Sequence, residues 1–165
     1  MIQTLRLVTN TPEETQAVGH ALGAQAQAGD IFLLTGPLGA GKTCLTQGIA
    51  RGLGVEGYVR SPTFVLMTRH HGRLTLHHVD LYRIDGAEAA WDLGLDEQLS
   101  GGGVCVVEWA DKAEELFPGS SLWIDLAYCG SEERRTLSFS GGLRHHREAL
   151  EELTADHLPD PGKDA

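Results

Sequence analysis

The sequence predicts an α/β protein with a mixed central β-sheet and helices on both faces, a three-layer arrangement. Two short apolar runs, Ile31–Thr35 and Val104–Trp109, are typical of strands that are covered on both sides. The first run leads through a glycine-rich turn into a helix-like segment, as in a parallel βα unit. Later segments pair like antiparallel hairpins, so we expect strands of both directions in one sheet.

The first helix is predicted to begin after Thr11. This threonine can cap the helix, Pro12 suits its first turn, and Glu14 stands three residues after the cap. The helix should run to about Ala28, where Gly29-Asp30 would stop it.

A second helix is predicted over residues 42–53, ending at Gly54. Residues 61–83 contain two strand-like runs on either side of His71-Gly72, which predicts a hairpin that turns there. In that register, His77 would lie opposite Leu66.

The last third of the chain predicts a short helix over residues 111–117 and an antiparallel pair formed by residues 121–128 and 134–140. A polar helix over residues 144–158 and a frayed tail would follow. We find no repeat and no linker. Residues 1–142 are therefore interpreted as one domain, and residues 143–165 as its C-terminal helix and tail.

Composition narrows the possible functions. The 165 residues are 41% hydrophobic, which is typical of a globular domain, and no apolar run approaches the ~20 residues that cross a bilayer. The start lacks a signal-peptide pattern, so we expect a cytoplasmic protein that does not bind membranes. Three dispersed cysteines predict neither disulfides nor a zinc site. A net charge of −10 disfavours unaided binding to nucleic acid.

The strongest motif is GPLGAGKT, Gly36 to Thr43, which matches the phosphate-binding loop pattern GxxxxGK[ST]. Lys42 is predicted to reach the β- and γ-phosphates, and the hydroxyl of Thr43 to hold Mg²⁺. Backbone amides at a helix start attract phosphate. The residues expected to contact nucleotide here are Gly36, Leu38, Gly39, Ala40, Gly41, Lys42, Thr43 and Cys44.

Two carboxylates compete for the metal side of this site. Glu108 follows four apolar residues, as the usual acid of such sites does, and Asp80 ends another strand-like run. Ligands gather at the carboxyl ends of parallel strands. We expect Glu108 to be a metal ligand, and Asp80 to orient water or a metal ligand, although either could be a solvated strand end.

Other candidates are less specific. Residues 61–64, SPTF, could sense the γ-phosphate or merely form a proline turn. Trp109 could stack on a ligand or fill the core. Arg134 and Arg135 could reach phosphates, but a solvated face of an edge strand is the more common role. The histidine pairs 70–71, 77–78 and 145–146 suggest metal, yet neighbouring strand residues point to opposite faces, so we do not favour a metal site.

Taken together, the motifs resemble those of the TsaE family, formerly YjeE. GPLGAGKT, SPTF, HHVDLYR, LGLDEQL and VEWAD follow in that family's order and spacing, from about Leu5 to Phe139. Pro37 replaces a common acidic residue, Cys44 replaces a common threonine, and EWAD replaces EWPE or EWAE.

The resemblance implies a P-loop NTPase fold and a bacterial ATPase that uses ATP and Mg²⁺. Such proteins serve the synthesis of N6-threonylcarbamoyladenosine in tRNA with the TsaD transferase and its partner TsaB, so tRNA would be met only through that complex. It implies catalytic or metal roles for Lys42, Thr43, Asp80 and Glu108, and places Thr11 near the nucleotide.

We therefore expect an ATPase that is weak alone and activated by its partners, because no arginine finger is evident in the sequence. Two alternatives remain open. One is a nucleotide-gated assembly factor in which hydrolysis is not essential. The other is a small-molecule kinase, although residues 86–103 lack the arginine that a kinase lid usually carries.

Overall fold

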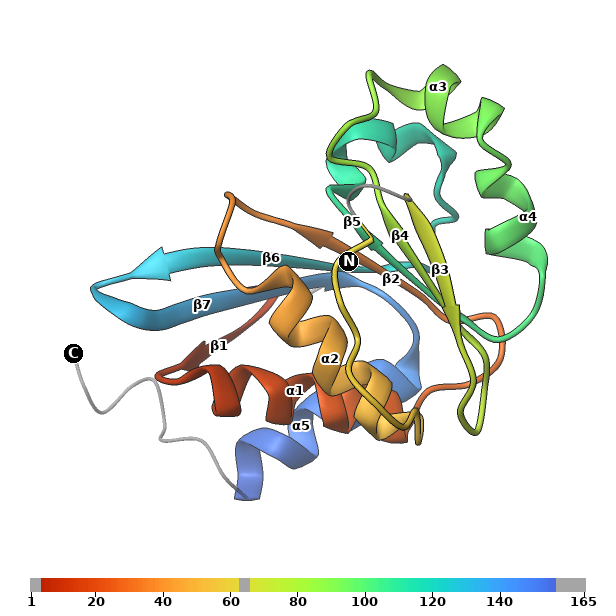
Figure 1. The fold of residues 1–165 in the computed structure, drawn as a ribbon. Coiled ribbons are helices and arrows are strands. Elements are labelled where there is room, and N and C mark those ends of the chain that lie inside the picture. Colours follow the sequence, from red (N-terminus) through yellow and green to blue (C-terminus); the bar gives the residue numbers. More distant parts are fainter. Residues whose placement is uncertain (1–3, 63–65, 157–165) are drawn as a thin grey trace.

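The computed structural model describes residues 4–62 and 66–156 and contains one seven-stranded sheet (Figure 1). Its strand order is β1-β7-β6-β2-β5-β4-β3. Strands β2, β4, β5 and β6 run parallel, whereas β1, β3 and β7 pair antiparallel with their neighbours. The strands are β1 Leu5–Thr9, β2 Ile31–Thr35, β3 Met67–His70, β4 Leu76–Asp80, β5 Val104–Glu108, β6 Leu122–Cys129 and β7 Ser131–Gly141.

Helices cover both faces of this sheet, which confirms the three-layer prediction. One hydrophobic core joins the sheet to α1, α2 and α5, and a second core covers the other face with α3, α4 and the 3-10 helix η1. The helices are α1 Pro12–Ala24, α2 Lys42–Gly52, α3 Ala87–Asp92, α4 Leu95–Ser100, η1 Ala110–Leu116 and α5 Arg144–Asp156. Among the described residues, no helix has the length and apolarity to cross a membrane.

Strands β2 and β5 are the doubly covered strands that the apolar runs predict. Every residue of β5 is buried, and Ile31, Phe32, Leu33 and Leu34 of β2 are buried on both faces. Because β4 lies beside β5 in parallel, Asp80 pairs in register with Glu108. Two acids that are 28 residues apart in the sequence thus end adjacent strands at the same edge.

Four glycines let α1 and α2 pack backbone against backbone. A Cβ atom at Gly19 would lie 2.3 Å from the carbonyl oxygen of Leu45, and a Cβ at Gly48 would lie 2.2 Å from that of Gln16. Gly23 and Gly52 make equally close approaches. This contact fixes α2, and hence the loop before it, against α1.

Several expectations for the first half of the chain require correction. The first helix ends at Ala24 and not near Ala28, because Arg73 donates hydrogen bonds to the carbonyl oxygens of Gly23 and Ala26, where the helical ladder stops. The hairpin turn spans residues 71–75, so His77 pairs with Arg69 and not with Leu66. A longer turn shifts the register by three residues.

The second half of the chain differs from the expected elements in three places. Residues 110–116 form a 3-10 helix, and residues 86–103 form two short helices that the sequence did not predict. The closing pair β6–β7 is confirmed, but β7 is an interior strand because the unpredicted β1 pairs with it. The expected solvated edge is therefore wrong at Arg135, which pairs with Thr9, whereas Arg134 lies just beyond that pairing and is half-buried. Helix α5 is described to residue 156, so the predicted tail lies outside the described residues.

Candidate functional site

The glycine-rich loop leaves β2 and enters α2 with backbone angles that only glycine adopts easily. Gly36, Gly39 and Gly41 have φ values of 135°, 78° and 108°. A Cβ at Gly36 would lie 2.3 Å from the carbonyl oxygen of Leu126 on β6. The loop is thus held tightly against the neighbouring strand.

Lys42 lies along this loop. Its Nζ donates hydrogen bonds to the carbonyl oxygens of Gly36 and Pro37, at 2.6 and 2.9 Å, and lies 3.9 Å from the centre of the Trp109 ring. Burial lowers the pKa of Lys42 below its usual value, although the carboxylates of Glu108 and Asp80 oppose that shift. The ammonium group is thus fixed at the mouth of the loop.

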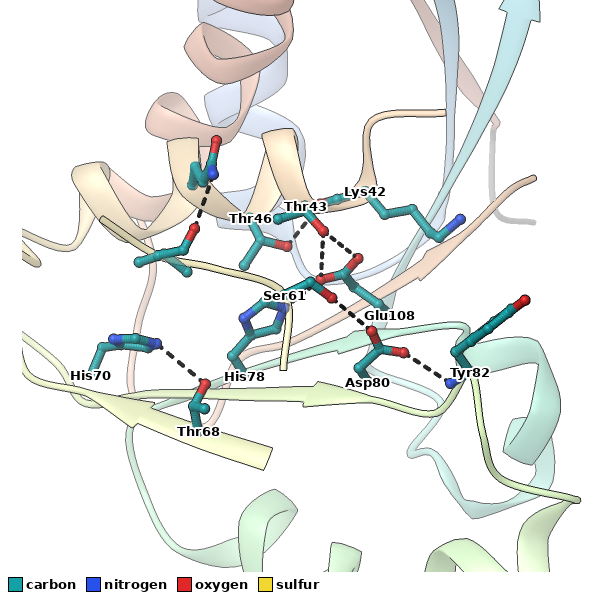
Figure 2. A network of polar contacts seen from close by, with 12 residues as sticks. Lys42, Thr43, Thr46, Ser61, Thr68, His70, His78, Asp80, Tyr82 and Glu108 are labelled. Atoms are coloured by element: carbon teal, nitrogen blue, oxygen red, sulfur yellow. Dashed lines mark hydrogen bonds and ion pairs between the residues drawn. The ribbon is translucent and has the colours of Figure 1, made fainter. Parts of the chain in front are cut away.

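The hydroxyl of Thr43 and the carboxylate of Glu108 meet directly beneath the loop (Figure 2). Thr43 Oγ1 donates to Glu108 Oε1 at 3.0 Å, and Glu108 is only 2% exposed. A pocket of about 360 Å³ opens above them, within the usual range for small-ligand sites. Its lining consists of Leu38, Gly39, Gly41, Lys42, Thr43, Cys44, Ser61, Asp80, Tyr82, Glu108 and Trp109.

Asp80 is buried beside Glu108 and is oriented by hydrogen bonds from both sides. Ser61 Oγ donates to Oδ2 at 2.8 Å, and the backbone N–H of Tyr82 donates to Oδ1 at 2.9 Å. The first residue of the SPTF segment therefore reaches the predicted acid, whereas residues 63–65 lie outside the described residues. Asp80 is not a solvated strand end.

Trp109 lines the pocket and also packs against the second hydrophobic core. Its backbone has φ 59°, a left-handed conformation that is uncommon for a bulky residue. Its ring packs against Tyr82, with the ring centres 5.0 Å apart, and covers Lys42. The strained turn after Glu108 thus turns the indole over the loop lysine.

Two residues of the closing strand pair hold the loop from outside. Arg135 Nε donates to the carbonyl oxygen of Ala40 at 3.0 Å, and Tyr128 Oη donates to that of Leu38 at 2.6 Å. The guanidinium of Arg135 also lies 4.4 Å from the centre of the Tyr128 ring. The sequence suggested a phosphate contact or a solvated face for Arg135, and it did not identify Tyr128.

With this geometry in hand, we compared the chain with known proteins. The family model described as "Threonylcarbamoyl adenosine biosynthesis protein TsaE" matches residues 9–137. The chain belongs to the TsaE family. The TsaE protein of Bacillus subtilis is 41% identical over 154 residues, which cover 93% of this chain and 96% of that protein. The TsaE protein of Streptomyces coelicolor is 50% identical over 105 residues, covering 60% and 70% of the two chains.

The crystal structure of YdiB from Bacillus subtilis superposes with a TM-score of 0.78 at 38% identity. The match covers 94% of this chain and 97% of that one. Membership of the TsaE family, inferred above from five short motifs, is therefore confirmed over most of the chain, and α5 follows the part that the TsaE model matches.

Some residues that the TsaE motifs suggested do not line the pocket. Thr11 caps α1 by accepting a hydrogen bond from the N–H of Glu14. Its neighbour Pro12 accepts a bond from Cys44 Sγ, so the start of α1 lies beside the rim that Cys44 lines. Ala40 is fully buried within the loop, and Gly36 lies at its base.

The donor set fits Mg²⁺. One hydroxyl and two carboxylates, from Thr43, Asp80 and Glu108, border a single pocket beside a phosphate-type loop. Magnesium prefers such oxygen ligands together with substrate phosphates. The described residues of this TsaE-family chain could therefore hold a nucleotide with its metal ion.

A second polar cluster joins Asp30, just before β2, to the start of α5. His145 Nε2 and His146 Nε2 approach Asp30 Oδ2, at 2.7 and 2.9 Å. However, His146 Nδ1 accepts a hydrogen bond from the N–H of Leu143, so a neutral ring carries its proton on Nε2. The positive end of the α5 dipole also disfavours a cation. His145 thus donates a hydrogen bond to Asp30. The three groups lie close enough to share a metal ion, but the protonated Nε2 of His146 disfavours that role.

Proposed function

We propose that this chain binds ATP with Mg²⁺ and hydrolyses it, and that hydrolysis serves N6-threonylcarbamoyladenosine formation in tRNA. The contact between Thr43 and Glu108 under the loop carries the proposal, since it joins the two predicted metal ligands in one pocket with Asp80. Family membership supports the pathway. We further propose that the protein acts in the cytoplasm with TsaD and TsaB.

In the proposed reaction, a water oxygen attacks the γ-phosphorus, and the bond between this phosphorus and the bridging oxygen of ADP breaks. Asp80 would accept a hydrogen bond from this water and orient it. Lys42 and the loop amides would stabilise the charge that develops on the phosphoryl oxygens. Thr43 and Glu108 would hold Mg²⁺, which when bound neutralises charge on the phosphates.

Partner activation is part of the proposal. Within the described part of the chain, no arginine lines the pocket, and Arg135 is occupied with loop carbonyls. An arginine supplied by a partner raises the rate of related nucleotide hydrolases by about 10³–10⁵. We therefore expect slow hydrolysis by the isolated chain and faster hydrolysis with the TsaD–TsaB complex.

Steady-state phosphate release, measured with and without TsaD–TsaB, tests this proposal. Lys42→Ala and Glu108→Gln should each lower the rate by at least tenfold, because each removes charge at the site. Glu115→Gln on η1 is the control, since Glu115 is exposed and outside the pocket. Full activity of both site variants would refute the site, and equal rates with and without partners would refute activation.

The two alternatives give different results in the same assays. If nucleotide binding alone gates assembly, a Glu108→Gln chain that binds ATP but does not hydrolyse it would still support tRNA modification. A kinase would release little phosphate without an acceptor. The structure does not favour a kinase lid at residues 86–103, because Ala90 of α3 and Leu95 of α4 are buried in the second core, between these helices and the sheet.

A further inference from the structure

His78 on β4 contacts the proposed metal ligand from outside the pocket lining. Its Nε2 lies 2.5 Å from Glu108 Oε2, and its side chain is completely buried. Figure 2 shows Glu108 between Thr43 of α2 and His78 of β4. His78 does not line the pocket, so a nucleotide would meet Glu108 without touching His78.

The strand register explains this contact. Asp80 pairs with Glu108 across the parallel strands β4 and β5, and His78 pairs with Val106. Because alternate residues share a face, His78, Asp80 and Glu108 all point to the same side of the sheet. His78 is thereby the diagonal neighbour of Glu108.

The adjacent His77 shows what an ordinary core histidine looks like in this fold. It points to the other face, is 5% exposed, and has partners at both ring nitrogens: Gln98 Oε1 at 3.0 Å and the carbonyl oxygen of Gly102 at 3.1 Å. His78 differs, because its Nδ1 is buried without a hydrogen-bond partner among the described residues. Within the described ranges, the ring's one hydrogen bond is thus the one to Glu108, and an unsatisfied buried atom calls for an explanation.

Glu108 needs such a donor. A carboxylate that is 2% exposed loses its hydration and requires hydrogen bonds in exchange. Thr43 supplies one, but in the proposed function its hydroxyl is also a metal ligand. His78 supplies the other from a position that a nucleotide cannot reach.

We propose that His78 is a positioning residue, which fixes the Glu108 carboxylate for Mg²⁺ through the hydrogen bond from its Nε2. This inference rests on the proposed nucleotide site. Residues that orient metal ligands in this way typically contribute 10- to 100-fold to metal affinity or activity.

A comparison of His78→Gln with His78→Asn tests the inference. The amide of glutamine can take the place of Nε2, whereas the shorter asparagine cannot reach Glu108. Both variants bury an amide at the same position. His77→Leu is the control on the same strand, because it removes two hydrogen bonds from the opposite face and leaves Glu108 untouched.

Two affinities are measured. The affinity for Mn²⁺ at saturating ADP is obtained from the electron paramagnetic resonance signal of free Mn²⁺. The affinity for ADP without metal is obtained in excess chelator. We expect His78→Asn to weaken metal binding by at least tenfold, His78→Gln to retain most of the affinity, and His77→Leu to retain the affinity of the unaltered chain. ADP binding without metal should be unchanged in all of them.

Wild-type metal affinity in a folded His78→Asn chain would overturn the role of His78, as would equal losses in the His78→Gln and His78→Asn chains or an equal loss in the His77→Leu chain. Failure of the unaltered chain to bind ADP, with or without metal, would instead overturn the proposed function.

Discussion

Asp30 should contribute measurably to stability, because its buried carboxylate holds the start of α5 onto the sheet. Oδ2 accepts a hydrogen bond from the backbone N–H of Gln27 at 2.9 Å and one from His145 at 2.7 Å, and His146 Nε2 lies 2.9 Å away, although poorly aligned. Hydrogen bonds to a charged group contribute about 1.5–3 kcal/mol each. Asp30→Asn keeps an oxygen for Gln27 but presents an uncharged group to both rings.

We expect Asp30→Asn to lower the free energy of unfolding by about 2–4 kcal/mol at pH 7, since the bond from the partly exposed His145 counts less. Urea denaturation followed by circular dichroism measures this change. Glu148→Gln on α5, the helix that carries His145 and His146, is the control. It removes the Arg144–Glu148 pair, whose side chains are 92% and 57% exposed, and should change little.

The loss of unfolding free energy in the Asp30→Asn chain should also depend on pH. Burial alone would raise the pKa of Asp30, but the nearby His146 ring and the hydrogen bonds from Gln27 and His145 outweigh it, so the pKa lies below its usual value. A carboxylate with a lowered pKa in the folded state stabilises the protein above its unfolded pKa of about 3.9, and that contribution is lost as pH falls through the folded pKa. The difference between the two chains should therefore persist down to about pH 4 and shrink below it. A difference no larger than that of Glu148→Gln at pH 7 would refute the reasoning.

Three further outcomes follow from single contacts. Gly48→Ala should lower the free energy of unfolding by about 1–3 kcal/mol, because the new Cβ would lie 2.2 Å from the carbonyl oxygen of Gln16. Thermal unfolding measures this loss, and an unchanged midpoint temperature would contradict the prediction. Arg135→Ala should weaken ADP binding about tenfold, since one to two hydrogen bonds from Arg135 to the loop carbonyls are worth about 1.4 kcal/mol. Calorimetry measures the ADP affinity, and an affinity equal to that of the unaltered chain would show that Arg135 does not hold the loop for the nucleotide. The thiol of Cys105, whose pKa burial raises to about 12, should react with a disulfide reagent only after unfolding, so rapid labelling of the native chain would contradict its burial.

Sequence patterns predicted the parts of the fold that local residues determine. The loop at Gly36–Thr43, the covered strands β2 and β5, and the capped start of α1 each depend on a few neighbouring residues. Strand β1 was not predicted because only Leu7 and Thr9 of its five residues are buried, and β7, which pairs with it, begins 122 residues after β1 ends. The helices α3 and α4 escaped because each has six residues, too few for a helical period.

The site divides in the same way. Lys42 and Thr43 follow from a contiguous motif, and Asp80 and Glu108 were placed because each ends its strand. Contacts that hold these groups could not be predicted, since each joins distant segments. Arg135 and Ala40 are 95 residues apart, and Tyr128 and Leu38 are 90 apart. Only the strand order brings β6 and β7 beside the loop.

The paired histidines show why residue type alone does not predict a site. In the pair 77–78, the alternation of a strand places the His77 ring in the core, where both of its nitrogens have hydrogen-bond partners, and the His78 ring against Glu108. In the pair 145–146, the start of a helix lets both rings approach the single carboxylate of Asp30. Each role depends on what the ring nitrogens meet, and every partner here lies at least 21 residues away except the N–H of Leu143. That one local bond fixes which nitrogen of His146 carries the proton, and so it disfavours the metal site that the sequence pair suggests.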